Sequence, residues 1–184
     1  RAGLPTRPFR FLSVGKWEPR KGHDLLLRAW ARAFAPDDPV ELVLHTSHGN
    51  DPQWRFEKAL SDLDLGPHAP VTCSPPTTLP RLVLLYSSCD CFALATRGEG
   101  WGLPVFEALA CGKPVIVPRF GALEELLDDS VADFVEVRQP VPADDGRVFT
   151  RREDCGLWAE PDLNHLVERL RHAQARRGCG DRHL

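Results

Sequence analysis

The sequence predicts an α/β fold, a Rossmann-like parallel sheet with helices on both faces. Short apolar runs alternate with segments whose apolar residues recur at helical spacing, and this alternation continues from Phe9 to Val137. Glycine and proline residues separate the segments, for example at Gly15 and Gly112. The chain has 184 residues, 42% of them hydrophobic and 27% charged, which suits one domain with a sizeable core. In such folds ligands bind in the crevice beyond the carboxyl ends of the strands.

The first units of the pattern are strand, loop and helix. Phe9–Val14 is an apolar run that ends at Gly15, and Asp24–Phe34 has apolar residues at helical spacing. Val40–Leu44 predicts a second buried strand, and a helical pattern follows the loop Ser47–Asp51. The apolar positions of this second helical pattern are Trp54, Phe56, Leu60 and Leu63.

The middle of the chain continues the alternation. A short strand at Val71–Cys73 leads through a double-proline turn into a helix at Leu79–Ser87. The run Cys91–Ala95 predicts another strand. After a glycine-rich stretch, Leu103–Ala110 predicts a helix that stops at Gly112, because glycine is the common C-terminal signal.

The last part of the chain adds two strands and two helices. Pro114–Val117 predicts a strand, Ala122–Leu127 a helix and Val131–Val137 a further strand. Gln139–Cys155, with its prolines, glycine and charges, predicts a loop or insertion. A final helix is expected from Pro161 to about Ala175, with proline in its first turn.

These elements predict the domain organisation. We expect residues 1–8 to be a linker, residues 9–175 to form one domain, and residues 176–184 to be a frayed tail. The sequence starts at Arg1 and contains no Met, so we expect it to be a fragment of a longer protein.

Charge and composition exclude several partners. The net charge is −3 and the pI is about 6.2, so no concentrated positive face is expected and no nucleic-acid partner is predicted. No apolar run has the length of a transmembrane segment, and the sequence shows no secretory leader. The scattered cysteines favour a reducing compartment, and we expect a cytoplasmic location or one at the cytosolic face of a membrane.

The sequence predicts no metal site. Cys89 and Cys91 form a pair without a second Cys or His pair at zinc spacing. None of the histidines has a partner at metal or catalytic-triad spacing, and His23 is expected to cap the helix that it opens. Walker-type, serine-hydrolase and dinucleotide fingerprints are absent as well.

Two carboxylates flank the start of a predicted helix. Glu99 lies in the glycine-rich loop and Glu107 in the second turn of the helix. Between them, Gly102 and Leu103 should offer free backbone N–H groups, which suit a phosphate. Carboxylates accept hydrogen bonds from hydroxyls. The stretch could therefore contact an anionic diphosphate and neutral hydroxyls together, and a nucleotide sugar presents both.

A second group of residues lies in the loop after the first strand. Gly15 allows a close approach of the backbone to a ligand. Lys16 and Lys21 could neutralise a diphosphate and the charge that grows on it as a sugar leaves.

The stretch from Glu99 to Glu107 resembles the paired-glutamate motif of glycosyltransferase family 4, E-G-F-G-L-P-x-x-E, with Trp101 in place of the usual aromatic residue. The segment from Gly15 to Gly22 resembles the family's G-R-x-x-x-x-K-G signature, with Lys16 where arginine is more common. Weaker matches follow at Gly121–Glu124 and Trp158–Pro161. The resemblance runs from about Phe9 to Ala175 and implies the C-terminal, donor-binding half of a GT-B fold.

The resemblance also implies roles for individual residues. Glu107 would bind the ribose hydroxyls of the nucleotide and Glu99 the hydroxyls of the donor sugar. Lys16, Lys21 and Glu99 would be catalytic in the sense that they stabilise the leaving group, without a protein nucleophile. Thr77 lies where family members contact the base. Residues implied to contact the diphosphate and sugar through backbone amides are Gly100, Trp101, Gly102 and Leu103, together with Gly15.

The implied function is retaining transfer of a hexosyl group from a nucleoside diphosphate sugar, without a metal or other cofactor. The residues do not distinguish a UDP-sugar from a GDP- or ADP-sugar. A saccharide, lipid or protein acceptor would bind mainly to an N-terminal domain outside this sequence, so the fragment alone is expected to be inactive or weakly active. Two alternatives stay open: a non-catalytic nucleotide- or carbohydrate-binding module with a glycosyltransferase fold, and a GT-B epimerase or phosphorylase relative.

Overall fold

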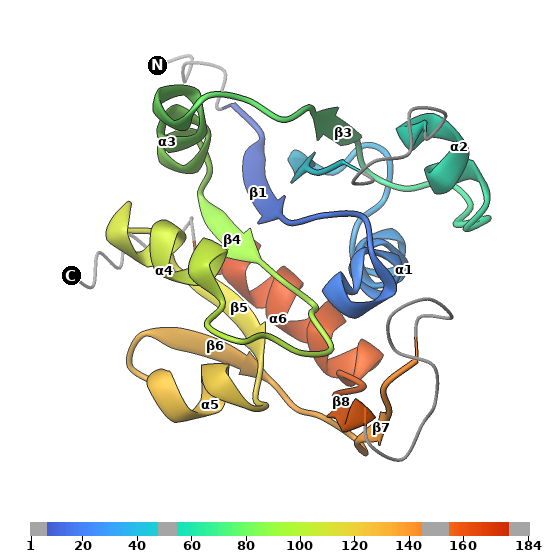
Figure 1. The fold of residues 1–184 in the computed structure, drawn as a ribbon. Coiled ribbons are helices and arrows are strands. Elements are labelled where there is room, and N and C mark those ends of the chain that lie inside the picture. Colours follow the sequence, from blue (N-terminus) through green and yellow to red (C-terminus); the bar gives the residue numbers. More distant parts are fainter. Residues whose placement is uncertain (1–6, 48–54, 145–154, 177–184) are drawn as a thin grey trace.

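The protein contains one six-stranded, all-parallel sheet with the strand order β3-β2-β1-β4-β5-β6 (Figure 1). The computed structural model describes residues 7–47, 55–144 and 155–176. Its strands are β1 (Phe9–Val14), β2 (Val40–His45), β3 (Val71–Ser74), β4 (Cys91–Ala93), β5 (Val115–Pro118) and β6 (Ala132–Val135). The sheet confirms the expected Rossmann-like class, and its order reverses between the neighbouring strands β1 and β4.

Helices cover both faces of this sheet, as expected (Figure 1). They are α1 (His23–Ala33), α2 (Phe56–Ser61), α3 (Leu79–Ser88), α4 (Leu103–Ala110), α5 (Ala122–Leu126) and α6 (Leu163–Arg176), with a short 3-10 helix, η1 (Pro19–Lys21), before α1. Helices α1, α2 and α6 contribute to one buried cluster, whereas α3, α4 and α5 contribute to the other. In the described part of the chain, no helix combines the length and apolar character that crossing a bilayer requires.

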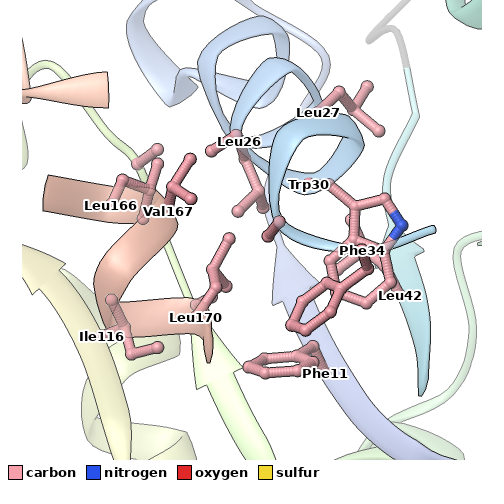
Figure 2. Packing of buried hydrophobic residues seen from close by; sticks show 14 of the residues in the cluster. Phe11, Leu26, Leu27, Trp30, Phe34, Leu42, Ile116, Leu166, Val167 and Leu170 are labelled. Carbon is pink, nitrogen blue, oxygen red and sulfur yellow. The ribbon is translucent and has the colours of Figure 1, made fainter. Parts of the chain in front are cut away.

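The core beneath α1 and α6 is built from aromatic and aliphatic side chains. Figure 2 shows Leu166 and Leu170 of α6 pointing toward Leu26 of α1. Trp30 is fully buried, its ring meets Phe11 edge to face at 5.5 Å, and its Nε1 donates to the carbonyl of residue 69 at 2.9 Å. Burial of each such side chain contributes about 1.5–3 kcal/mol, so this layer fixes α1 and the loop that precedes it.

Several expected boundaries are wrong near the C-terminal end. Helix α6 begins at Leu163, because the Oδ1 atom of Asp162 accepts from the backbone N–H groups of Asn164 and His165 at 2.8 and 2.9 Å and so caps the helix. Pro161 does not lie in the first turn and instead forms an isolated antiparallel bridge with Val137.

The expected loop Gln139–Cys155 also contains structure. Strand β7 (Val141–Pro142) pairs antiparallel with β8 (Leu157–Trp158), which follows the loop. Two-residue strands carry no periodicity, so the sequence pattern could not indicate them. Residues 145–154 of the expected loop lie outside the described residues.

Smaller differences affect three other elements. Strand β4 ends at Ala93 instead of Ala95, and β6 spans only Ala132–Val135 within the expected Val131–Val137. Helix α2 stops at Ser61, and the expected helical position Leu63 lies beyond its end, while Trp54 is outside the described residues.

Candidate functional site

The loops after β1 and β4 meet at the carboxyl edge of the sheet, where the strand order reverses. Gly22 makes this approach possible, because its φ is 67° and a Cβ atom there would lie 1.9 Å from the carbonyl oxygen of Ala95. Two main-chain segments, one after each strand, are thus in direct contact at the place where ligands bind in such sheets.

The contact brings Lys21 and Glu99 together as an ion pair. The Nζ atom of Lys21 donates to both carboxylate oxygens of Glu99, at 2.7 and 3.0 Å. The two side chains are only 11% and 7% exposed, so the pair is shielded from water. Arg20 approaches the same carboxylate at 3.6 Å. The structure therefore places two of the predicted catalytic residues in one site.

Arg20 is a site residue that the sequence analysis did not identify. Its Nη1 donates to the carbonyl of Gly98 at 2.6 Å, and its own carbonyl accepts from Thr96 Oγ1 at 3.1 Å and from Arg97 N at 2.7 Å. The only signal in the sequence was its position next to Lys21, which is weak because neighbouring charged residues are common in solvated loops.

Arg97 connects segments that surround the site. Its guanidinium donates to both carboxylate oxygens of Asp24 at 2.9 and 3.0 Å, to Glu160 at 3.1 Å and to the carbonyl of Pro19 at 2.6 Å. Burial opposes the charge of Arg97, but these carboxylates raise its pKa above the ordinary value. Burial likewise opposes ionisation of Asp24, yet Arg97 lowers the pKa of that carboxyl. The sequence analysis did not identify Arg97, since its partners are far away along the chain.

The turn at Gly15 and Lys16 rests on His23. The Nε2 atom of this buried histidine lies 3.2 Å from the Gly15 carbonyl and 3.1 Å from the Lys16 carbonyl. Carbonyl oxygens only accept, so Nε2 carries the proton. The ring stacks on Trp17 with centroids 5.4 Å apart. Burial lowers the pKa of His23. The expectation that His23 caps α1 is wrong, because Gly22 occupies the N-cap position and the imidazole turns under the preceding loop.

The turn sets the direction of one backbone donor. The Gly15 carbonyl points to His23, so the N–H of Lys16 in the same peptide unit points the opposite way. Within the described residues this N–H has no hydrogen-bond partner, and the Lys16 side chain is exposed and forms no ion pair. Gly15 lies beside the stem of Lys21, because a Cβ atom on Gly15 would be 3.3 Å from Lys21 Cδ.

The glycine-rich loop ends at the start of α4. Gly102 occupies the N-cap position with φ 68°, and a Cβ atom there would lie 2.6 Å from Leu123 Cδ2. Among the described residues, the N–H groups of Gly102 and Leu103 have no hydrogen-bond acceptor. The next residue is a proline, so these two donors are the ones that this helix start offers to an anion. The side chains of Trp101 and Leu103 are 69% and 65% exposed.

Glu107 lies on the exposed side of α4 and has one side-chain partner among the described residues. The hydroxyl of Tyr86, on α3, donates to Glu107 Oε2 at 2.7 Å. Burial and the neighbouring carboxylate raise the pKa of Tyr86 above the ordinary value. Thr77 is exposed in the loop between β3 and α3, and no contact within the described residues joins it to Lys21 or Glu99. Tyr86 was not identified from the sequence either.

The site is rich in cations and backbone donors and poor in metal ligands. In the described part of the chain, no three His, Cys, Asp or Glu residues come together in a way that could hold a metal ion. The loop after β1 contributes the cationic side chains of Lys16, Arg20 and Lys21. Such an arrangement suits an anionic ligand that also carries hydroxyls for Glu99 and Glu107.

Sequence comparisons identify related proteins. The family model described as glycosyl transferases group 1 matches residues 1–140. A D-inositol 3-phosphate glycosyltransferase of Salinispora arenicola is 35% identical over 169 residues, which cover 86% of this chain and 37% of that protein. The protein of the same name from Rhodococcus jostii is 38% identical over 124 residues, which cover 66% of this chain and 27% of that protein. The chain thus spans about a third of the length of these relatives.

Solved structures with the same fold are more distant in sequence. HepE of Anabaena in complex with UDP-glucose matches with a TM-score of 0.58 and 23% identity, over 92% of this chain and 43% of that one. The C-terminal domain of the group 1 protein LpcC from Francisella tularensis matches with a TM-score of 0.56 and 21% identity, over 70% and 68% of the two chains. Sucrose-phosphate synthase from Thermosynechococcus elongatus matches with a TM-score of 0.63 and 24% identity, over 94% and 37%. At these identities the matches show the fold.

Proposed function

Because the chain belongs to the glycosyl transferases group 1 family, we propose that it is the donor-binding domain of a retaining hexosyltransferase of family 4 that uses a nucleoside diphosphate sugar. The observation that carries the proposal is the buried Lys21–Glu99 pair at the point where the strand order reverses. A cation and a carboxylate at this position can contact the two chemically different halves of such a donor.

In this proposal Lys21 binds the diphosphate and Glu99 the hydroxyls of the sugar. Lys21 already lies 2.7 Å from Glu99, so a ligand held by both would place its anionic and hydroxyl groups side by side. As the bond between sugar and diphosphate breaks, negative charge grows on the leaving group, and a fixed ammonium group stabilises it. Arg20 adds a second positive charge 3.6 Å from the same carboxylate. Lys16 extends this positive edge toward solvent.

Backbone donors complete the proposed anion site. The N–H of Lys16 comes from the β1 loop, and those of Gly102 and Leu103 come from the N-terminus of α4. These donors and the lysines would supply the positive potential for the diphosphate, and we propose transfer without a metal. Gly100 and Trp101 would lie along the sugar, Glu107 would bind the ribose, and Thr77 would lie near the base.

The rest of the proposal concerns the longer protein. We propose that residues 9–175 form the donor half of a GT-B enzyme and that another domain binds the acceptor. The LpcC match, which covers similar shares of both chains, supports an independent C-terminal unit. Relatives named D-inositol 3-phosphate glycosyltransferase make a phosphorylated polyol the first acceptor to test. UDP is the first nucleotide to test, because HepE was solved with UDP-glucose.

A binding experiment tests the proposal. UDP, GDP and ADP sugars are titrated into the chain by calorimetry, with and without a chelator, and the tightest ligand is then titrated into Glu99→Gln and Glu107→Ala. We expect metal-independent binding of one nucleotide class, which both substitutions weaken. A donor affinity that neither substitution changes, or that requires a divalent cation, would contradict the proposed site.

A transfer assay separates the enzyme from a non-catalytic module. The full-length protein and this chain are each supplied with the bound donor and an acceptor panel. Transfer by the full-length protein that Glu99→Gln abolishes supports the transferase, whereas binding without transfer supports a module. Release or epimerisation of the sugar without any acceptor would indicate a different GT-B activity.

A further inference from the structure

The single tyrosine of the chain joins a buried helix face to an exposed carboxylate. The Tyr86 side chain is 1% exposed, and its ring packs against Phe92 with centroids 6.0 Å apart. Its hydroxyl points to the neighbouring helix α4, where it donates to Glu107 Oε2 at 2.7 Å. A rigid, buried donor therefore holds one oxygen of a carboxylate whose residue faces solvent.

We propose that Tyr86 is a positioning residue that fixes the Glu107 carboxylate for hydrogen bonds from the ribose hydroxyls of the donor. The inference rests on the proposed function, in which Glu107 binds the ribose. It adds a residue on α3 to the proposed site.

The physical reason is the freedom of an exposed glutamate. An unrestrained Glu side chain rotates about several bonds, and binding that needs one rotamer must offset the rotational entropy that is lost when the side chain becomes fixed. The Tyr86 hydroxyl removes much of this freedom before the ligand arrives. It occupies Oε2 and leaves Oε1 for the ligand.

The surroundings keep Tyr86 in this role. Its ring cannot move without opening the cluster formed with Phe92 and Val105. A hydrogen bond also links α3 to the segment after α4, because Lys113 Nζ donates to the carbonyl of Ser87 at 2.9 Å. Burial and the carboxylate raise the pKa of Tyr86, so the hydroxyl stays protonated and remains a donor.

The first test compares two ligands that differ in the ribose. UDP and inorganic pyrophosphate are titrated into the wild-type chain and into Tyr86→Phe, which keeps the buried ring. We expect UDP to bind up to about tenfold more weakly to Tyr86→Phe, because the ligand itself must then restrict the Glu107 side chain, while pyrophosphate affinity is unchanged. Unchanged pyrophosphate binding also shows that the variant is folded.

Ser87→Ala is the matched control. This change removes a hydroxyl from the same helix, but that hydroxyl donates to the Val83 carbonyl and does not touch Glu107. Both ligands should bind as they do to wild type. A similar loss of UDP affinity in Ser87→Ala, or an equal loss of UDP and pyrophosphate in Tyr86→Phe, would mean that α3 acts through general stability, and the inference would be overturned.

A double-mutant cycle shows whether Tyr86 acts through Glu107. In the Glu107→Gln background, Tyr86→Phe should weaken UDP binding by much less than it does in wild type. Additive losses would overturn the inference. If Glu107→Gln itself leaves UDP affinity unchanged, or if wild type binds no UDP, the proposed function fails and the inference fails with it. If Glu107→Gln weakens UDP binding but Tyr86→Phe does not, only the inference fails.

A measurement without substitution gives independent evidence. Tyrosine labelled with carbon-13 at Cζ yields one NMR signal, since the chain has one tyrosine. We expect UDP to shift this signal, because the carboxylate that accepts from the hydroxyl also binds the ribose, and we expect pyrophosphate to shift it far less. If saturating UDP leaves the chemical shift of this signal unchanged, the inference is overturned.

Discussion

The backbone N–H of Arg97 donates to the carbonyl of Arg20 at 2.7 Å, and this bond joins the loops after β1 and β4 directly beside the Lys21–Glu99 pair. The Arg97 side chain reinforces the junction through Asp24, Glu160 and the Pro19 carbonyl. The relative position of the lysine and the glutamate therefore depends on a residue whose side chain bonds to other partners.

Replacing Arg97 by Gln should destabilise the chain by about 1–3 kcal/mol, because the change removes a guanidinium that is only 13% exposed from its two carboxylate partners and leaves the Pro19 carbonyl without this donor. Urea unfolding followed by tryptophan fluorescence measures this change. Arg138→Gln is the control, because Arg138 is 61% exposed and pairs with Asp162 at the surface, so a clearly smaller loss of stability is expected. Equal losses in the two variants would contradict the role assigned to Arg97.

Replacing Gly22 by Ala should cost about 3 kcal/mol or more, since the new Cβ atom would lie 1.9 Å from the Ala95 carbonyl oxygen in addition to the strain at φ 67°. Gly112→Ala is a matched control with the same φ of 67° but nothing within 4 Å of the new atom, so about 1 kcal/mol is expected. Thermal or urea unfolding of both variants gives the difference. If Gly22→Ala is no worse than Gly112→Ala, the two loops are not in close contact.

Replacing Lys21 by Gln should weaken UDP binding by about tenfold or more, because a charge-assisted hydrogen bond contributes about 1.5–3 kcal/mol. Calorimetry measures the UDP affinity of both proteins, and repeating it at a second salt concentration shows how much of the difference is electrostatic. Lys58→Gln removes a lysine of the exposed Lys58–Asp62 pair, 76% and 60% exposed, and should leave UDP affinity unchanged. Equal effects of the two changes would indicate a general charge effect rather than a site.

The stability of the chain should fall between about pH 6.5 and 5 in part because of His23. Its pKa is lowered in the folded state, so the unfolded chain binds the proton more tightly, and this group favours unfolding increasingly as the pH drops below its ordinary pKa near 6.5. His23→Gln can still donate to the Gly15 and Lys16 carbonyls but does not titrate. Urea unfolding of both proteins at pH 5, 6, 7 and 8 should give a shallower pH dependence for the variant. If the free energies of unfolding of the two proteins change equally with pH, His23 does not contribute to the pH dependence.

The fold could be predicted from the sequence because its signals are local. Runs such as Phe9–Val14 and the helical spacing of Asp24–Phe34 reflect burial on a sheet or on one helix face, and neither depends on distant residues. The glycine-rich stretch before α4 is also a local signal, and Gly102 lies at the helix start as expected. The start of α6 was misplaced because two N-terminal signals compete there, and the Asp162 cap prevails over Pro161.

The site could be predicted only in part, because its contacts join residues far apart in the chain. Lys21 and Glu99 were identified by their types and local motifs, and the structure brings them together. Arg97 and Tyr86 act on partners in other segments, and a single sequence carries no record of which segments meet. His23 was assigned to the helix that it begins, whereas burial turns its ring under the preceding loop.

The Lys21–Glu99 pair also has a consequence for discrimination among anions. Each of these groups already satisfies the other. A ligand that engages only Lys21 must separate the pair and leave a carboxylate that is 7% exposed with Arg20, at 3.6 Å, as its remaining cation. Free phosphate brings a second negative charge close to that carboxylate. A molecule that brings an anion to the lysine and hydroxyls to the glutamate would restore both sets of contacts. In the proposed donor site, the pair would therefore favour an intact sugar donor over small anions.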